Sequence, residues 1–223
     1  MRSLYASDLQ KKYVMAVTGV VLMGFVLVHM AGNLKLYLGA SSLDHYSAWL
    51  RTAGEPVLPR EVLLWVVRVV LVGAVVLHMD AAFRLARSSR RARPTPYAAP
   101  RTYVAADFAS RTMRWTGPIV GLFVVFHLLD LTWGTTNPHF SHGHPYENVV
   151  ASFERAPVAI AYVIANLALA FHLYHGAWSL FQSLGVGGRG TRAATRRFAI
   201  GYAGLVALGN VSFPIAVLTG VIR

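Results

Sequence analysis

The sequence contains no cysteine and few charged residues. Without cysteine, the 223-residue chain forms no disulfide and does not by itself hold an iron–sulfur cluster, which needs thiolates. Charged residues make up only 13% of the chain, about half of the share usual in soluble domains. Hydrophobic residues make up 55%, and the mean hydropathy is +0.48. These proportions indicate that a bilayer is the solvent for much of the surface, and that one membrane domain fills 1–223 with no room for a soluble catalytic domain.

Five apolar runs are long enough to cross a hydrocarbon core, which needs about 20 residues of helix. The first run is too long for a typical signal peptide and is not followed by a small-residue cleavage site, so we expect it to be retained. The sequence therefore predicts an all-α membrane protein with five transmembrane helices. The predicted spans are 13–34, 62–83, 115–133, 158–181 and 198–221.

The positive charge is concentrated on alternate sides of these spans. Of 21 basic residues, 15 lie before residue 13, in 84–114, or in 186–197, and only five lie in the other connections and at the C-terminus. The positive-inside rule places the first group, and with it the N-terminus, in the cytoplasm. The net charge of +12 is therefore explained by membrane topology, and we do not expect nucleic-acid binding.

Histidine is costly inside a spanning helix unless it is paired or bound, so each such residue is a functional candidate. Helix direction converts position into depth: His29 and His127 fall in the outer half of the membrane, and His78 and His175 fall in the inner half. His172 lies one turn further out than His175. The intervals from His29 to His78, His127 and His175 are 49, 49 and 48 residues. Two histidine pairs at two depths suit two haem irons, each with two imidazole ligands from facing helices.

Several other residues carry weaker expectations. Asp80 and Arg84 stand four residues apart and are expected to pair, whereas Arg68, the deepest cation, either snorkels outward or binds a haem propionate or a quinone carbonyl. Asp130 lies near the outer end of its span. Glycines beside the histidines are expected to let helices approach closely or to leave room for a flat macrocycle. These are Gly19, Gly24, Gly32, Gly73, Gly121 and Gly176.

The outer connections are expected to differ from one another. The segment LDHYSAWLR, residues 43–51, has the apolar spacing of a short interfacial helix. The segment 134–154 is polar and is predicted to be a loop. Its histidines, His139, His142 and His144, lack the carboxylate or thiolate spacing of a metal site, which favours an ordinary solvated loop.

Three motifs resemble a known family. The run KKYVMAVTGVVLMGFVLVHMAGNL (11–34) resembles the first helix, FHLYHGAWSLFQSLG (171–185) the fourth helix, and LDHYSAWLR the first outer loop of the cytochrome b anchor subunit of succinate dehydrogenase and fumarate reductase. The closest resemblance is to the single-subunit, five-helix, di-haem type. It implies a haem-binding four-helix bundle plus one helix, and axial ligands at His29, His78, His127 and His175, with His172 as the alternate for the fourth.

The resemblance also implies partners and a location. Such a subunit anchors a flavoprotein subunit and an iron–sulfur subunit at the cytoplasmic face of the bacterial inner (plasma) membrane, and it has no dehydrogenase activity alone. It is expected to hold one or two haem b groups, to contact lipid, and to pass electrons to a quinone, expected to be menaquinone. A higher oligomer of the complex is compatible with this. Leu173 departs from the pattern, since some relatives carry a glutamate there for proton transfer.

Three alternatives stay open at this point. The inner histidines, His78 with His175, or His172 in place of one of them, suit a Rieske-type 2Fe–2S cluster if a partner subunit supplies two cysteines. A scaffold without redox groups would tolerate loss of the histidines. A transporter would show broken helices and inverted repeats, and the sequence has neither. The quinone candidates are Asn33, His45 and Arg68 at the outer end, and Ser7, Arg84 and Gln182 at the inner end.

Overall fold

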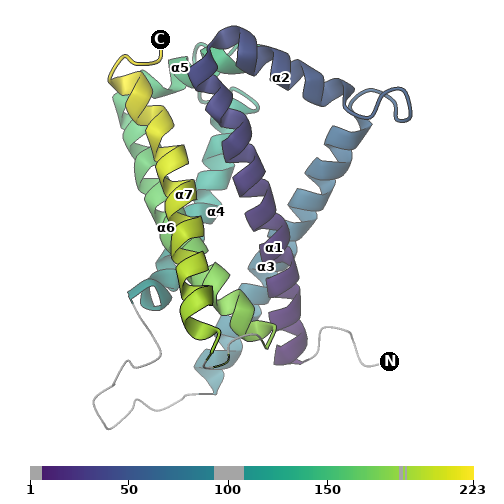
Figure 1. Ribbon diagram of the computed structural model, residues 1–223, viewed down its shortest axis with the longest axis vertical. Coiled ribbons are helices and arrows are strands. Elements are labelled where there is room, and N and C mark those ends of the chain that lie inside the picture. Colours follow the sequence, from purple (N-terminus) through teal and green to yellow (C-terminus); the bar gives the residue numbers. More distant parts are fainter. Residues whose placement is uncertain (1–6, 93–107, 186–187, 189) are drawn as a thin grey trace.

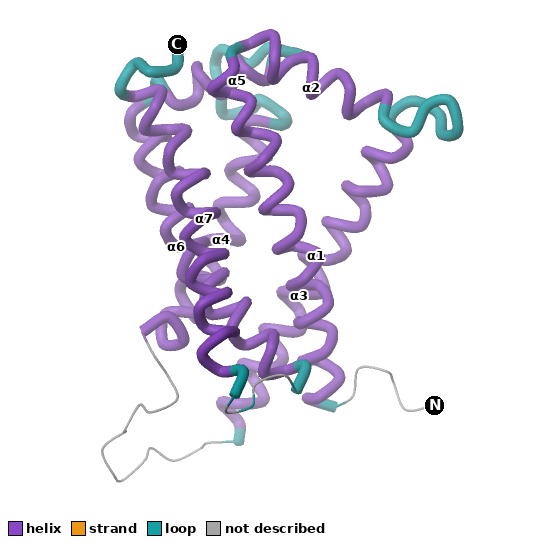
Figure 2. Tube along the Cα trace, viewed as in Figure 1, coloured by secondary structure: helices purple, strands orange, loops and turns teal. Residues whose placement is uncertain are grey.

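A computed structural model describes residues 7–92, 108–185, 188 and 190–223, and within these ranges every regular element is a helix (Figure 2). Five helices are long and apolar enough to cross a membrane, which confirms the predicted all-α membrane fold. Each predicted span coincides with one of them, although three of the spans overrun the helix C-terminus by one to three residues. The five helices are α1 (Asp8–Asn33), α3 (Val62–Arg91), α4 (Phe108–Leu131), α6 (Ala156–Ser183) and α7 (Arg192–Leu218).

The long helices form a bundle in which α1 and α7 run in the same direction, from the end that holds the start of α1 to the end that holds the C-terminus (Figure 1). Figure 1 shows α6 and α7 side by side, with α4 packed on α6. Helices α1 and α3 lie together near the start of α1 and separate toward the other end of the bundle. Much of the basic connection between α3 and α4, residues 93–107, and residues 1–6, 186–187 and 189 lie outside the described residues.

Small residues set the closest helix contacts. Ala159 and Ala177 of α6 and Ala199 of α7 are fully buried, which lets the backbones of neighbouring helices approach as small residues do in membranes. Gly209 of α7 is in closer contact still, because a Cβ atom there would lie 2.3 Å from the sulfur of Met30 on α1. These contacts fix the rotation of α6 and α7, and with it the direction in which their polar residues point.

Two short helices cover the end of the bundle at which α1 ends, which the sequence predicts to be the outer end and which we call the outer end (Figure 1). The predicted interfacial helix is confirmed as α2 (Ala40–Thr52), which follows a short 3₁₀ turn, η1 (Leu34–Leu38). The prediction that 134–154 is only a loop is wrong, because it contains α5 (Pro145–Phe153). Proline starts this helix without losing a hydrogen bond.

Polar side chains fasten this outer end together. Asn148 of α5 donates to the carbonyl of Ser141 (2.8 Å) and accepts from its N–H (2.7 Å). Asp44 of α2 accepts from the N–H of Tyr146 (3.1 Å), at the beginning of α5. The Tyr146 hydroxyl then donates to the carbonyl of Arg223 (2.9 Å). The cap made by α2 and α5 therefore joins the first outer connection to the C-terminal end of α7.

Candidate functional site

The outer pair of predicted histidines meets between α1 and α4. The rings of His29 and His127 lie 5.9 Å apart, measured between centroids, and are nearly perpendicular at 87°. Phe25, one turn before His29, stacks on its ring at 5.2 Å. Both histidines stand four residues before the end of their helices, at Asn33 and Leu131. The pair therefore lies about one turn below the cap.

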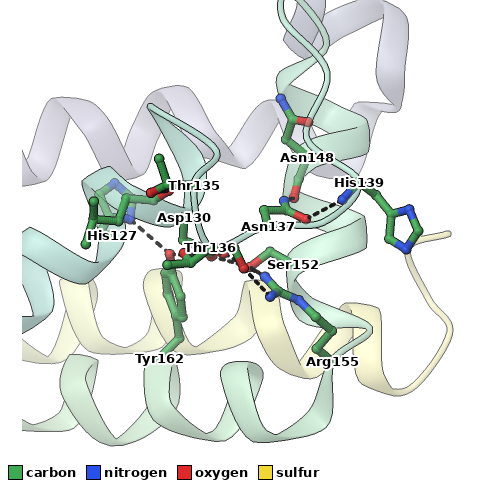
Figure 3. A network of polar contacts seen from close by, with 11 residues as sticks. His127, Asp130, Thr135, Thr136, Asn137, His139, Asn148, Ser152, Arg155 and Tyr162 are labelled. Carbon is green, nitrogen blue, oxygen red and sulfur yellow. Dashed lines mark hydrogen bonds and ion pairs between the residues drawn. The ribbon is translucent and has the colours of Figure 1, made fainter.

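A buried polar network holds His127 from behind (Figure 3). The hydroxyl of Tyr162 on α6 lies 3.4 Å from His127 Nδ1 and 3.0 Å from a carboxylate oxygen of Asp130. Asp130 is completely buried. Its carboxylate also accepts from Arg155 Nη2 (2.6 Å) and from the Ser152 hydroxyl. A buried carboxylate needs such partners because desolvation alone is costly.

This network is the part of the site that sequence reasoning missed. Asp130 stood out only as a polar residue near the end of its span, and Tyr162, Ser152 and Arg155 were not singled out. The usable signal was a carboxylate in an apolar helix, which requires a cation or several donors. The identity of its partners could not be read, because they lie 22 to 32 residues further along the chain.

The inner pair meets between α3 and α6. His78 faces His172, with ring centroids 6.3 Å apart and an interplanar angle of 64°. Glycines border both rings: a Cβ atom on Gly19 of α1 would lie 3.6 Å from His78 Cε1, and one on Gly117 of α4 would lie 3.9 Å from His172 Cε1. The expectation of close approach is confirmed at Gly19 and also at Gly32 and Gly121, where a Cβ atom would lie 2.9 Å from Tyr46 and 3.8 Å from Met79. The other three predicted glycines, Gly24, Gly73 and Gly176, have nothing within 4 Å of a Cβ atom.

The fourth-helix histidine that meets His78 is the predicted alternate. The sequence favoured His175 over His172 by resemblance, because His175 precedes a glycine. In the structure His172 faces His78, and His175 lies about one turn further along α6. Both Nδ1 atoms are buried, and that of His172 has no hydrogen-bond partner among the described residues. A buried ring nitrogen of this kind is a candidate for an additional ligand.

Hydrogen bonds select the free nitrogen on two of the four rings. The Thr18 hydroxyl donates to the carbonyl of Val14 (2.7 Å), so at 3.1 Å from His78 Nδ1 it accepts the Nδ1 proton. Tyr162 donates to Asp130, as the shorter distance indicates, and accepts from His127 Nδ1. A neutral imidazole carries one N–H, so Nε2 of His78 and of His127 keeps its lone pair for a metal.

The ring separations fit a metal held between two imidazoles. Metal–imidazole bonds are about 2.0–2.1 Å long, so the centroids of two rings on opposite sides of one ion lie about 6–6.5 Å apart. The observed separations are 5.9 and 6.3 Å. Thr18, which contacts His78, precedes His29 by eleven residues on the same helix, so the two levels are about 16 Å apart along α1. The four histidines and their neighbours fit two bis-imidazole haem groups at two depths.

The quinone candidates do not converge on one place. At the inner end, Ser7 caps α1 by accepting from the N–H of Gln10 (3.2 Å), and Arg84 pairs with Asp80 at 2.8 Å, as the spacing predicted. Gln182 lies in the last turn of α6. At the outer end, Asn33 ends α1, His45 bonds Ser41 within α2 (3.2 Å), and the Arg68 guanidinium lies over the ring of Trp65 (4.9 Å).

An apolar groove and the loop histidines lie outside the two histidine pairs. An apolar groove of about 330 Å³ lies between α1 and α3 where they separate, lined by residues such as Phe25, Val28 and Val67. Among the described residues, no three histidine, aspartate or glutamate side chains lie close enough to hold a metal ion. Of the loop histidines, His142 contacts Phe140 (5.1 Å between ring centroids) and His144 Nδ1 is 3.9 Å from Asp44.

Comparison with known proteins gives one match. Residues 101–211 match the family model described as the succinate dehydrogenase/fumarate reductase transmembrane subunit. The matched region takes in α4 to α6 and most of α7, and with them His127, His172 and the Asp130 network. It leaves out α1 and α3, which carry His29 and His78. No curated protein and no solved structure matches the chain.

Proposed function

Because the chain belongs to the family of succinate dehydrogenase/fumarate reductase transmembrane subunits, we propose that it is the electron-transferring anchor of such a complex. A membrane subunit of this complex works with other subunits, which we take to be the flavoprotein and iron–sulfur subunits. The observation that carries the redox role is the double histidine contact, His29 with His127 and His78 with His172, at two levels of one bundle. A passive anchor has no need of two buried imidazole pairs.

In this proposal each histidine pair holds one haem b. Bound haem would supply one-electron transfer through the membrane, toward a quinone. The chain's own residues do the rest. Thr18 and Tyr162 keep the Nδ1 protons of His78 and His127 in place, so that Nε2 is the ligating atom. Hydrogen-bond acceptors on the non-ligating nitrogen, such as these two hydroxyls, orient imidazole ligands and raise their basicity. The apolar helices around them exclude water.

The distribution of charge supports the orientation in this proposal. The basic ends of α3 and α7, including Arg90, Arg91 and Arg192, lie at the same end of the bundle as the start of α1. On the positive-inside rule this end faces the cytoplasm of a bacterial cell, where the soluble subunits and anionic lipid would meet it. The outer cap of α2 and α5 then faces the opposite compartment. The quinone, expected to be menaquinone, stays a prediction at either end.

A reduced-minus-oxidised absorption spectrum of the purified complex tests the proposal. We expect two haem b signals in the wild type. H127A should remove one signal and H172A the other, whereas H175A is the matched control on the same helix and should keep both. The absence of any haem signal would overturn the proposal. A low-g electron spin resonance signal of the Rieske type in its place would assign the inner histidines to a 2Fe–2S cluster shared with a partner.

Loss of the inner signal in H175A, with retention in H172A, would contradict the geometry and restore the ligand favoured by the family resemblance. Quinone reduction by the same variants decides between the redox anchor and a plain scaffold. A scaffold should keep full quinone reduction in both H127A and H172A complexes. The redox anchor should lose it in H172A, since electrons enter at the cytoplasmic level.

A further inference from the structure

We propose that Tyr162, Asp130 and Arg155 form a positioning network that fixes His127 and sets the reduction potential of the outer centre independently of the inner one. This inference rests on the proposed function. It adds a role for three residues that lie outside the four histidines, and it begins from the hydrogen bonds behind His127 (Figure 3). None of the three is placed to ligate a metal; each acts through the imidazole of His127.

The direction of the hydrogen bonds follows from the chemistry of the groups. Arg155 is always charged, and its Nη2 atom lies 2.6 Å from Asp130 Oδ1, so Asp130 is an ionised acceptor. Tyr162 has one hydroxyl hydrogen, and at 3.0 Å it donates this to Asp130 Oδ2. The hydroxyl oxygen, 3.4 Å from His127 Nδ1, is left as an acceptor. The carboxylate thus strengthens the hydrogen bond from His127 Nδ1 to the Tyr162 hydroxyl, because it accepts the hydrogen of that hydroxyl.

The packing around Tyr162 keeps this hydroxyl in one place. Only 4% of the residue is exposed. Its ring meets Phe123 at 5.0 Å and Phe126 at 5.8 Å on α4, and Phe153 at 4.8 Å on α5. Aromatic contacts at these distances prefer edge-to-face geometry, and the interplanar angles are 88°, 64° and 73°. A tyrosine held on three sides has no room to turn away from His127.

The carboxylate is anchored from three elements. Ser152 at the end of α5 and Thr136 in the outer connection donate to it, Thr136 at 3.5 Å. Arg155, at the start of α6, binds Asp130 and also donates to the carbonyl of Thr136 (2.7 Å). Preorganised charge in a site without water acts strongly on a nearby redox group. Removing the hydroxyl or the carboxylate should therefore weaken His127 as a donor to oxidised iron and raise the outer potential.

The inner pair has a different support, which makes the effect separable. His78 donates to the Thr18 hydroxyl, and that hydroxyl passes its own hydrogen to a backbone carbonyl and not to a carboxylate. Thr18 lies about 16 Å from the outer level along α1. A change in the Asp130 network should consequently move the outer potential and leave the inner one in place.

The test is a redox titration of the purified complex, in which the two haem signals report each centre without turnover. For Y162F we expect the outer centre to favour its reduced form by up to about tenfold, equal to about 59 mV for one electron. D130N should shift it in the same direction and further, because it also leaves Arg155 uncompensated. Y146F is the matched control: it removes another outer tyrosine hydroxyl, bonded to Arg223, and should shift neither centre.

Four outcomes would overturn the inference. The outer potential in Y162F could equal that of the wild type, both centres could shift together, or Y146F could shift the outer centre as much as Y162F. Loss of the outer haem in Y162F would also count against tuning, since the hydroxyl would then serve assembly. If D130N does not fold, Y162F alone decides. A wild-type complex without haem refutes the proposed function itself, which is a different result from an unshifted Y162F.

Discussion

The two histidine levels of this protein differ in the groups that hold their histidines in place. At the outer level, His127 is held by a tyrosine, an ion pair and a serine drawn from α4, α5 and α6. At the inner level, His78 is held by the hydroxyl of Thr18 and bordered by Gly19. The outer pair stands at helix ends, where connections can supply charged groups. At the inner level, His78 stands 13 or more residues from either end of α3 and His172 stands 11 or more from either end of α6, where groups of the neighbouring helices surround them.

The difference shows how depth limits the means of holding a ligand. Deep in a bilayer, burial of a charged partner is strongly unfavourable. A hydroxyl that donates its hydrogen to a carbonyl of its own helix can still accept from the histidine, and it adds no charge. Near the interface a buried ion pair is tolerated. The cap of α2 and α5 covers the pair of Asp130 and Arg155, and further donors satisfy the carboxylate. The first three of the following experiments each try to break one level while sparing the other, and the last removes an ion pair that belongs to neither.

The largest expected effect is on the stability of the outer level. D130A leaves Arg155 without its partner, and breaking a buried ion pair in this way costs about 3–5 kcal/mol. D44A is the control, since Asp44 accepts one backbone hydrogen bond in the same cap and its loss should cost about 1 kcal/mol. Thermal denaturation of the purified complex in detergent measures both. Equal loss of stability in the two variants would mean that the Asp130 network is no stronger than an ordinary surface contact.

The next effect concerns space at the inner level. G19A should be tolerated, because its Cβ atom lies at an ordinary contact distance of 3.6 Å from His78. G19L should push the His78 ring aside, at about 1–3 kcal/mol for overpacking, and remove the inner haem signal but not the outer one. G201L is the control on α7, where a Cβ atom meets nothing within 4 Å. Retention of both haem signals in G19L would show that Gly19 does not border the site.

A smaller effect is expected from the hydroxyl that supports His78. T18V keeps the shape of the side chain and removes the hydrogen bonds that the hydroxyl forms with the Val14 carbonyl and with His78; the bond to His78 is worth about 1 kcal/mol. We expect the inner centre to release its haem several times more readily in a haem-transfer assay, with the outer centre unchanged. An unchanged release rate at the inner level would show that the 3.1 Å contact between Thr18 and His78 contributes nothing to ligand orientation.

The smallest effect should come from the ion pair between Asp80 and Arg84 in the second half of α3. Arg84 and Asp80 are both more than a third exposed, and exposed pairs of this kind contribute less than about 1 kcal/mol. D80N should therefore lower the denaturation temperature far less than D130A, although both remove one carboxylate from a spanning helix. A loss as large as that of D130A would place Asp80 in an interface with another subunit.

Much of this architecture could be predicted because hydropathy and helix direction are local properties. The five spans, the helix at 43–51 and the two levels of histidines follow from run length, spacing and the sign of the loops. The choice between His172 and His175 did not follow. They differ by about one turn of one helix, and which of them faces His78 depends on the rotation of α6 in its packing against α4 and α7, which local sequence does not reveal.

The helix α5 and the Asp130 network could not be predicted from local sequence for a related reason. Asn148 is satisfied by Ser141, and Asp130 by residues of two later elements, and nothing in the local sequence of either announces the partner. A carboxylate near the end of an apolar span is still a usable warning. Such a carboxylate predicts that a cation lies close to it. Here that cation is Arg155, the nearest basic residue in the following connection.

The separation of the two levels has an electrical consequence. About 16 Å along α1 is roughly half of a hydrocarbon core about 30 Å thick. One elementary charge that crosses the whole core gains or loses about 2.3 kcal/mol for each 100 mV of membrane potential. Under the proposed redox function, an electron that moves between the levels would therefore exchange about half of that amount with the membrane potential. The eleven residues from Thr18 to His29 would then set how strongly an energised membrane favours one direction of transfer over the other.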